Sequence, residues 1–241
     1  MTKTRNRLIS VGIALLLLIA VAVFIIPQET ANAAWDGNAA DGLTGDGTEA
    51  DPYLINNASD LAYLANSVND GTASYDGEYI KISDSADIDL SGHNWTPIGT
   101  ESNPFKGTFD GNKQTITNLT LNGDDCGLFG YNSGTLKDIC LEKISVTARE
   151  NAGGVCVFNN GTIDGCGILS GTINGSNPNG GSFGGISKKN TGTISRCFNH
   201  ADVTGAYCSG IVFNNSSIVK DCYNAGTIEG ASYATGISYE N

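Results

Sequence analysis

One unit of sequence recurs along the second half of the chain. A complete copy has a Gly followed by an apolar residue, an Asn/Gly corner, a Thr (Ile218 in the fourth copy) followed by an apolar residue, and then Cys or Ile; the fifth copy only begins this pattern. The copies read GLFGYNSGTLKDI from Gly127, GVCVFNNGTIDGC from Gly154, GISKKNTGTISRC from Gly185, GIVFNNSSIVKDC from Gly210 and GISYEN from Gly236. Self-similarity at a period of roughly 20 to 50 residues is typical of stacked repeats, each too small to bury its own apolar face. The sequence therefore predicts a solenoid, which offers surface and length rather than one deep pocket.

The spacing of the repeats favours short β-strands. Leu136, Ile163, Ile194 and Val219 occupy equivalent places, at intervals of 27, 31 and 25 residues. These intervals fit a constant cross-section with loops of variable length, and the longest interval carries an extra stretch at 174–182. A coil of this length with about three short strands suits an all-β parallel β-helix, in which each coil adds roughly 4.8 Å along the axis.

Three of the seven cysteines fall at one place in the repeat. Cys166, Cys197 and Cys222 occupy it in the later copies, and Ile139 occupies it in the first. A position shared by Cys and Ile is apolar, so we expect these thiols to be small core side chains. A disulfide framework is the alternative for an exported protein, although the odd cysteine count argues against it. No CxxC pair occurs and both His residues are isolated, so we expect no metal or other cofactor.

The amino terminus has the layout of a secretory signal peptide over residues 1–33. A basic stretch at 3–7 precedes an apolar run at 8–26, and an Ala-Asn-Ala triplet at 31–33 follows. An uncleaved anchor is the alternative, since the run is just long enough to span a bilayer of about 30 Å. We therefore expect a secreted or cell-surface protein, with membrane contact only through an uncleaved N-terminal segment.

The net charge of the chain limits the classes of partner that it can bind. Removal of the predicted signal peptide changes the formal net charge from −12 to −14, because three basic residues and one Glu leave with it. A chain this acidic repels nucleic acid and anionic membranes, so we expect neither as a partner. Host or cell-wall glycans or proteins remain as candidate partners.

Composition and periodicity divide the rest of the chain into three parts. Residues 34–47 are mostly Ala, Asp, Gly and Thr, which predicts a flexible lead-in. Residues 48–125 predict a cap and the first coils, with a helix at 58–69 whose apolar residues recur at helical spacing and whose N-cap is Ser59. The repeats at 126–241 give four coils and a truncated fifth, which indicates either a fragment of a longer protein or an open last rung.

Four blocks, in order, resemble the amino-terminal half of bacterial surface proteins with GLUG motifs. They are DPYLINNASDLAYLANSVNDG from Asp51, ADIDLSGHNWTPIG from Ala86, NPFKGTFDGNKQTITNLTL from Asn103 and GLFG from Gly127. In the later repeats the second Gly of the tetrapeptide is Val157, Lys188 or Phe213, so only the first copy matches strictly.

That resemblance implies a right-handed parallel β-helix on exported bacterial proteins, often as one module of a longer chain. Such modules occur beside adhesive or cell-wall regions, and in some immunoglobulin A1 proteases whose peptidase is a separate domain. The family has no established catalytic residue in the repeat. The resemblance therefore brings no catalytic residue to this chain.

Four aspartates are candidates for catalysis or calcium binding, and each also has a possible structural role. Asp84, Asp87, Asp89 and Asp110 could form an acid/base pair or a calcium site. Asp beside Gly or Asn is also the ordinary chemistry of a tight turn, and we expect that role.

An aromatic pair raised a second possibility. His93 and Trp95 could form a sugar-stacking platform, but we expect Trp95 to pack under the first coils. The aligned Thr135, Thr162 and Thr193 could suggest an ice-binding ladder, yet Ile218 interrupts it, which favours simple β-propensity.

The sequence thus predicts an exported, non-enzymatic β-solenoid that acts as an adhesion or spacer module, with no catalytic, cofactor-binding or metal-binding residue. The chain has no HExxH motif, and neither His lies in a recognisable nucleophile motif. The alternative is a β-helical polysaccharide lyase or glycosidase, or the non-catalytic arm of a secreted protease.

Overall fold

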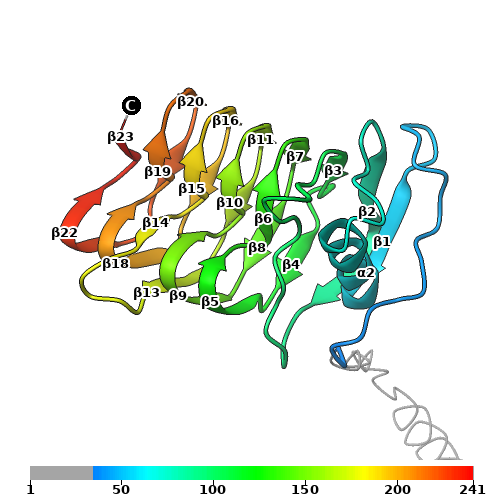
Figure 1. The fold of residues 1–241 in the computed structure, drawn as a ribbon, viewed down its shortest axis with the longest axis horizontal. Coiled ribbons are helices and arrows are strands. Elements are labelled where there is room, and N and C mark those ends of the chain that lie inside the picture. Colours follow the sequence, from blue (N-terminus) through cyan, green and yellow to red (C-terminus); the bar gives the residue numbers. More distant parts are fainter. Residues whose placement is uncertain (1–34, 241) are drawn as a thin grey trace, which may run out of the picture. The chain divides into compact units, whose positions relative to one another are not determined.

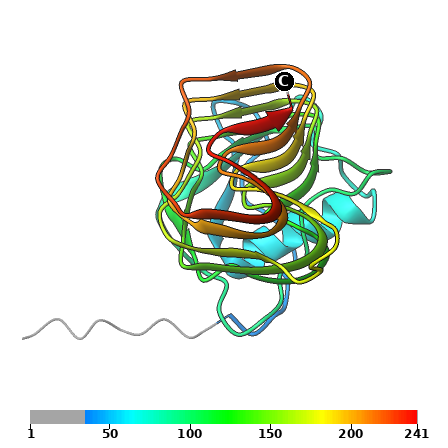
Figure 2. The same cartoon turned by 90° about the vertical axis from the view of Figure 1, so that its left-hand side faces the viewer.

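A computed structural model describes residues 35–240 of the chain. These residues form a parallel β-solenoid with one helix near its amino-terminal end (Figure 1). Viewed along the stack, successive coils lie over one another with the same cross-section (Figure 2). The predicted fold class is confirmed. The predicted signal peptide at 1–33 lies outside the described residues.

The largest sheet has twelve strands and supplies two sides of each coil. Strand β2 belongs to both sides, because its first half pairs with β3 and its last residues pair with β4. In sheet order the strands are β20 (Ile218–Lys220), β16 (Thr193–Ser195), β11 (Thr162–Asp164), β7 (Thr135–Lys137), β3 (Thr108–Asp110), β2 (Tyr79–Asp89), β4 (Thr115–Thr117), β8 (Cys140–Glu142), β12 (Gly167–Ile168), β17 (Phe198–Asn199) and β21 (Tyr223–Asn224), with β1 (Tyr53–Asn57) beside β2.

Two smaller parallel sheets complete the coils. The six-stranded sheet contains β13 (Gly171–Gly175), β18 (Asp202–Ser209), β14 (Ser182–Gly184), β9 (Ile144–Gly153), β5 (Thr120–Cys126) and β22 (Ile228–Thr235). The five-stranded sheet contains β23 (Ser238–Glu240), β19 (Val212–Asn215), β15 (Ser187–Asn190), β10 (Cys156–Asn159) and β6 (Phe129–Asn132).

The strand register confirms the equivalences that the repeats predicted. Ile163 pairs with Leu136 on one side and with Ile194 on the other, and Ile194 pairs in turn with Val219. The longest coil differs from its neighbours mainly in one loop. There β13 and β14 align with the two ends of single strands in the adjacent coils, and residues 176–181 form a loop between them.

The core is a set of apolar columns that run along the stack. Cys166 and Cys197 are fully buried, as is Ile139 at the same place in the first repeat. Cys222, in the last described coil, is half-buried. The prediction of core side chains is thus confirmed for Cys166 and Cys197, and all seven cysteines lie in the described residues as free thiols.

A ladder of buried asparagine side chains, which we call the Asn ladder, runs beside the apolar columns. It consists of Asn132, Asn159, Asn190 and Asn215 on β6, β10, β15 and β19. Each Nδ2 donates to the Oδ1 of the next Asn at 2.8 Å. A buried amide is costly unless it is hydrogen-bonded, and here each rung supplies the partner for the next.

Each repeat coil turns sharply between its two strands of the twelve-stranded sheet, such as β7 and β8, through one residue in the left-handed region. That residue is Asp138, Gly165, Arg196 or Asp221, with φ of 51°, 66°, 54° and 54°. Only glycine adopts this conformation without a steric cost, and Asp tolerates it better than most other residues. The recurring turn explains why the coils keep one cross-section despite different corner residues.

Helix α2 (Ala58–Asn69) packs on β1 and β2 at the amino-terminal end of the stack (Figure 1). Its buried face carries Leu61, Leu64 and Val68. The N-cap is Asn57 rather than the predicted Ser59, because the extended Asn57 accepts a hydrogen bond from the Asp60 N–H. The helix bounds agree with the predicted ones.

Residues 35–47 precede the first strand and hydrogen-bond to it and to the helix. The Ala40 N–H donates to the Ser59 carbonyl at 2.9 Å, and the Leu54 N–H donates to the Thr44 carbonyl at 2.8 Å. The predicted lead-in therefore lies against the cap, where it brings Trp35 beside the helix.

Candidate functional site

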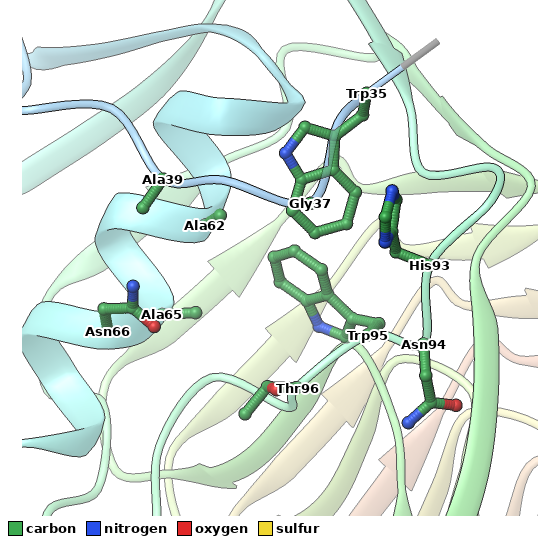
Figure 3. Close-up of a pocket in the computed structure, with 10 residues that line it drawn as sticks. All are labelled: Trp35, Gly37, Ala39, Ala62, Ala65, Asn66, His93, Asn94, Trp95 and Thr96. Carbon is green, nitrogen blue, oxygen red and sulfur yellow. The ribbon is translucent and has the colours of Figure 1, made fainter.

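A pocket of about 180 Å³ lies between α2 and the loop that follows β2 (Figure 3). We call it the cap pocket. Its lining comes from the lead-in, the helix and the loop, and comprises Trp35, Gly37, Ala39, Ala62, Ala65, Asn66, His93, Asn94, Trp95 and Thr96.

Two indoles form the centre of the cap pocket. Trp35 and Trp95 have ring centroids 5.9 Å apart, with their planes inclined at 54°. Trp95 is 2% exposed and donates its Nε1 hydrogen to the Leu128 carbonyl, so it packs on the first coils as predicted. Trp35 is half-buried and donates its Nε1 hydrogen to the Asn38 carbonyl at 2.8 Å. Neither ring thus has a free N–H, and Trp35 is the one whose carbon surface is partly exposed.

His93 forms the third aromatic side of the pocket. Its imidazole meets Trp35 edge to face, with ring centroids 5.4 Å apart. The ring also lies on the backbone of Gly37, where a Cβ would come within 2.8 Å of the imidazole Nδ1. Gly37 has φ of +85°, so both its conformation and this contact require glycine. Figure 3 shows the imidazole across the indoles from α2.

Polar groups stand around the three rings. Among residues 35–240, the side chains of Asn66 and Thr96 have no hydrogen-bond partner. Asn94 uses its Oδ1 to accept from the Asn122 N–H at 2.7 Å, which leaves its amide donors to the pocket. No Asp, Glu, Lys or Arg lines the pocket.

Asp36 lies between two lining residues in the sequence, and its carboxylate is hydrogen-bonded within its own turn. Asp36 accepts from both the backbone N–H and the side-chain amide of Asn38, at 2.9 and 3.0 Å. These hydrogen bonds hold the pKa of Asp36 below its ordinary value. The carboxylate is therefore ionised at neutral pH and lies one residue from the pocket lining.

The carboxylates that the sequence suggested for catalysis or calcium are engaged in local structure. Asn112 joins two of them, since its Nδ2 donates to Asp84 at 2.6 Å and its N–H to Asp110 at 2.7 Å. Asp110 also pairs with Lys137 across adjacent coils at 2.9 Å. No group of three or more His, Cys, Asp or Glu side chains suited to a metal ion occurs among residues 35–240.

Asp89 has a similar local role. It accepts from the Ser91 N–H at 2.9 Å and from the Asn118 side-chain amide at 2.8 Å. Partial burial raises its pKa, but these hydrogen bonds outweigh that effect and the pKa is lowered. Asp89 is the last residue of β2, where the alternation of residues 88–90 predicts an outward side chain.

The buried thiols are poor nucleophiles. Burial raises the pKa of Cys126 to about 11 and that of Cys208 to about 12. The thiolate is the reactive form of cysteine, so these side chains remain largely un-ionised at neutral pH. Their environment is that of core residues.

A second hollow, of about 450 Å³, lies beside the loop at 176–181 and is open to solvent. It is lined by Asp124, Arg149, Glu150, Ser176, Asn177 and Pro178. Its one cation, Arg149, pairs with Asp124 at 2.8 Å, and both side chains are more than half exposed. An exposed pair of this kind contributes little binding energy. The cap pocket, with its three rings, is the better candidate site.

The sequence suggested His93 and Trp95 as a sugar-stacking platform, but packing was the expected role of Trp95, and Trp35 was assigned only to the lead-in. A lone Trp in a segment of small and acidic residues carries no periodic signal, so only the fold reveals its neighbours. The one available cue was that both tryptophans of the chain flank the predicted cap.

Comparison with known proteins gives partial matches. No protein-family model matches the chain. Halomucin of Haloquadratum walsbyi is 30% identical over 158 residues, which is 59% of this chain and 2% of halomucin. A predicted Gly-rich membrane protein of Evansella cellulosilytica is 33% identical over 129 residues, which is 50% of this chain and 15% of that protein. The matched region is thus a small part of each relative.

One solved structure has a backbone trace similar to that of this chain. It is a predicted immunoglobulin A1 protease from Bacteroides ovatus, 17% identical, with a TM-score of 0.49 over 81% of this chain and 86% of that one. Within residues 35–240, no helix has the length and apolar character needed to cross a bilayer.

Proposed function

We propose that the chain is an exported, non-enzymatic β-solenoid that serves as a surface adhesion or spacer module of a longer modular protein. Its partners are glycans or proteins of a host or of a cell wall. The observation that carries the proposal is the unbroken parallel register through the repeat coils, from β7 through β11 and β16 to β20.

That register gives the solenoid a stiff body with long outer faces. Backbone hydrogen bonds, the apolar columns and the Asn ladder all run along the same axis, so each coil is held by its neighbours on both sides. A body of this kind holds a binding surface away from its point of attachment. Extension along one axis is what a spacer or adhesion module requires.

The matched relatives support a place at the cell surface. The Evansella cellulosilytica protein is named as a membrane protein, and this chain matches only a small part of it. The blocks that resemble GLUG-motif proteins, from Asp51 to Gly130, point the same way. A module within a longer surface protein agrees with both.

The alternative is an enzyme, either a β-helical polysaccharide lyase or glycosidase, or the non-catalytic arm of a secreted protease. A glycosidase of the usual kind needs two carboxylates that are free to meet the substrate. Here Asp84 and Asp110 are bound to Asn112, and Asp89 is bound to Asn118 and Ser91. These contacts favour binding over turnover.

A glycan-array screen, run beside an activity assay on acidic polysaccharides, separates the two classes. We expect stable binding to a subset of glycans and no chain cleavage. Turnover of a polysaccharide without stable binding would overturn the proposal and favour the enzyme.

A further inference from the structure

We infer that the cap pocket binds one ring of an uncharged sugar, such as a terminal pyranose of a glycan. This inference rests on the proposed function and names the ligand class of its site. The pocket is formed by the pairing of Trp35 with His93 and Trp95 against α2 (Figure 3).

The size of the cap pocket limits its ligand to a single ring. Its volume of about 180 Å³ lies below the range of roughly 300 to 1,000 Å³ that is typical of pockets for drug-sized molecules. It corresponds to roughly six water molecules at about 30 Å³ each. Longer glycans would therefore place one ring in the pocket and extend into solvent.

The charge of the pocket excludes ions as the preferred ligand. None of its ten lining residues is Asp, Glu, Lys or Arg. An anion would meet no fixed cation there and would lie near the ionised Asp36. A cation would find Asp36 already occupied by Asn38. An uncharged ligand avoids both costs.

The mixture of carbon surface and polar groups matches a sugar ring. Both indole N–H groups are used internally, and Trp95 is buried, so the half-buried Trp35 is the indole that presents apolar surface to the ligand. The Asn66 amide and the Thr96 hydroxyl have no partner in residues 35–240 and can bond to hydroxyls. A pyranose has C–H faces for the first kind of contact and hydroxyls around its edge for the second.

The ring geometry also fixes where the ligand lies. With centroids 5.9 Å apart, the two indoles contact each other and leave no space for a ring between them. The ligand therefore packs against Trp35 on the side toward Asn66 and Thr96, and His93 contacts Trp35 from the opposite side (Figure 3). Trp95 supports this surface from within the core.

The test uses a property of the sequence, which has two tryptophans, both of them in the pocket. Intrinsic tryptophan fluorescence and calorimetry of the full chain are followed during titration with glucose, galactose, mannose, N-acetylglucosamine and glucuronate. We expect a saturable response to at least one neutral sugar, with a Kd on the order of 1 mM for so small a ligand. The response to glucuronate should be at least about tenfold weaker than that to the best neutral sugar.

Three variants locate the response. Trp35→Ala and Asn66→Ala should each weaken binding, Trp35→Ala by about tenfold or more. Tyr131→Ala is the matched control, because Tyr131 stacks on Phe158, between β6 and β10, and is not part of the lining of the cap pocket. Its Kd should equal that of the wild type. Asn66→Ala keeps the test valid if Trp35→Ala fails to fold.

Several outcomes would overturn the inference. They are a flat response to every neutral sugar, unchanged affinity in both pocket variants, or preferred binding of glucuronate or of a free amino acid. Array binding that survives Trp35→Ala would remove the cap pocket as the site and leave the proposed function intact. Polysaccharide cleavage by the full chain would instead remove the proposed function.

Discussion

The Asn ladder offers the sharpest test of how the coils are held together. Asn159 is 1% exposed and stands in the middle of the ladder. Its Nδ2 donates to Asn190 at 2.8 Å, and its Oδ1 accepts from Asn132 at 2.8 Å. Two longer hydrogen bonds reach the carbonyls of Gly161 and Thr193, at 3.2 and 3.3 Å. Asn159→Ala removes all four.

The expected cost follows from these contacts. Each of the two short hydrogen bonds contributes about 1 kcal/mol net, and a buried partner left partly unsatisfied costs about 1 kcal/mol more. The Asn132 amide keeps its bond to the Gly134 carbonyl, and Asn190 keeps the Gly192 N–H, which limits the loss. Asn159→Ala should therefore lower the free energy of unfolding by about 3 kcal/mol.

Its neighbour Asn160 supplies the control. Asn160 is exposed, and its side chain accepts one hydrogen bond, from the Thr191 hydroxyl. Asn160→Ala should change the free energy of unfolding by less than about 0.5 kcal/mol. Urea unfolding followed by far-UV circular dichroism measures both variants. Equal midpoints for the two variants would refute the structural role of the ladder.

Three further predictions follow from the corners, the charges and the thiols. Gly165→Ala should destabilise the protein by about 1 to 2 kcal/mol because φ is +66° there. Gly123→Ala should not, because a Cβ at Gly123 would meet only the Cys126 Sγ, at 3.9 Å. Equal losses in thermal unfolding would contradict the argument about the corner. Hydrogen bonds from Arg196 hold the pKa of Asp164 below its ordinary value, so this carboxylate stabilises the fold above about pH 4, and that stability is lost as the pH falls below it. In acid titrations Asp164→Asn should flatten the loss of stability below pH 4, and an unchanged slope would contradict the assignment. A thiol reagent should modify the buried cysteines only after denaturation, when all seven react with or without prior reduction, and fewer without reductant would indicate disulfides.

The sequence was informative where one position repeats in every coil. Two such positions align directly in the sequence: the column from Leu136 to Val219, and the position that Cys and Ile share. They align because an inward position accepts only apolar side chains. Helix α2 was equally readable from its apolar spacing. Burial determines these features, and it produces a periodic pattern of apolar residues in the sequence.

Other features of the structure have no distinctive pattern in the sequence. The Asn ladder recurs in each copy, yet Asn is also the ordinary residue of a turn, so its burial could not be inferred. The residue with left-handed backbone at the corner is Asp, Gly or Arg in different coils. Because no single residue type recurs there, the sequence does not reveal the shared conformation. Trp35 joins the cap pocket through a contact between a non-repeated segment and the loop after β2, and no local pattern encodes such a contact.

The central claim is that this solenoid binds a glycan without altering it. One measurement tests that claim directly: the full chain is titrated with an uncharged oligosaccharide while binding and new reducing ends are recorded together. The account predicts saturable binding, no new chain ends, and loss of binding in Trp35→Ala. Shortened oligosaccharide chains would contradict it.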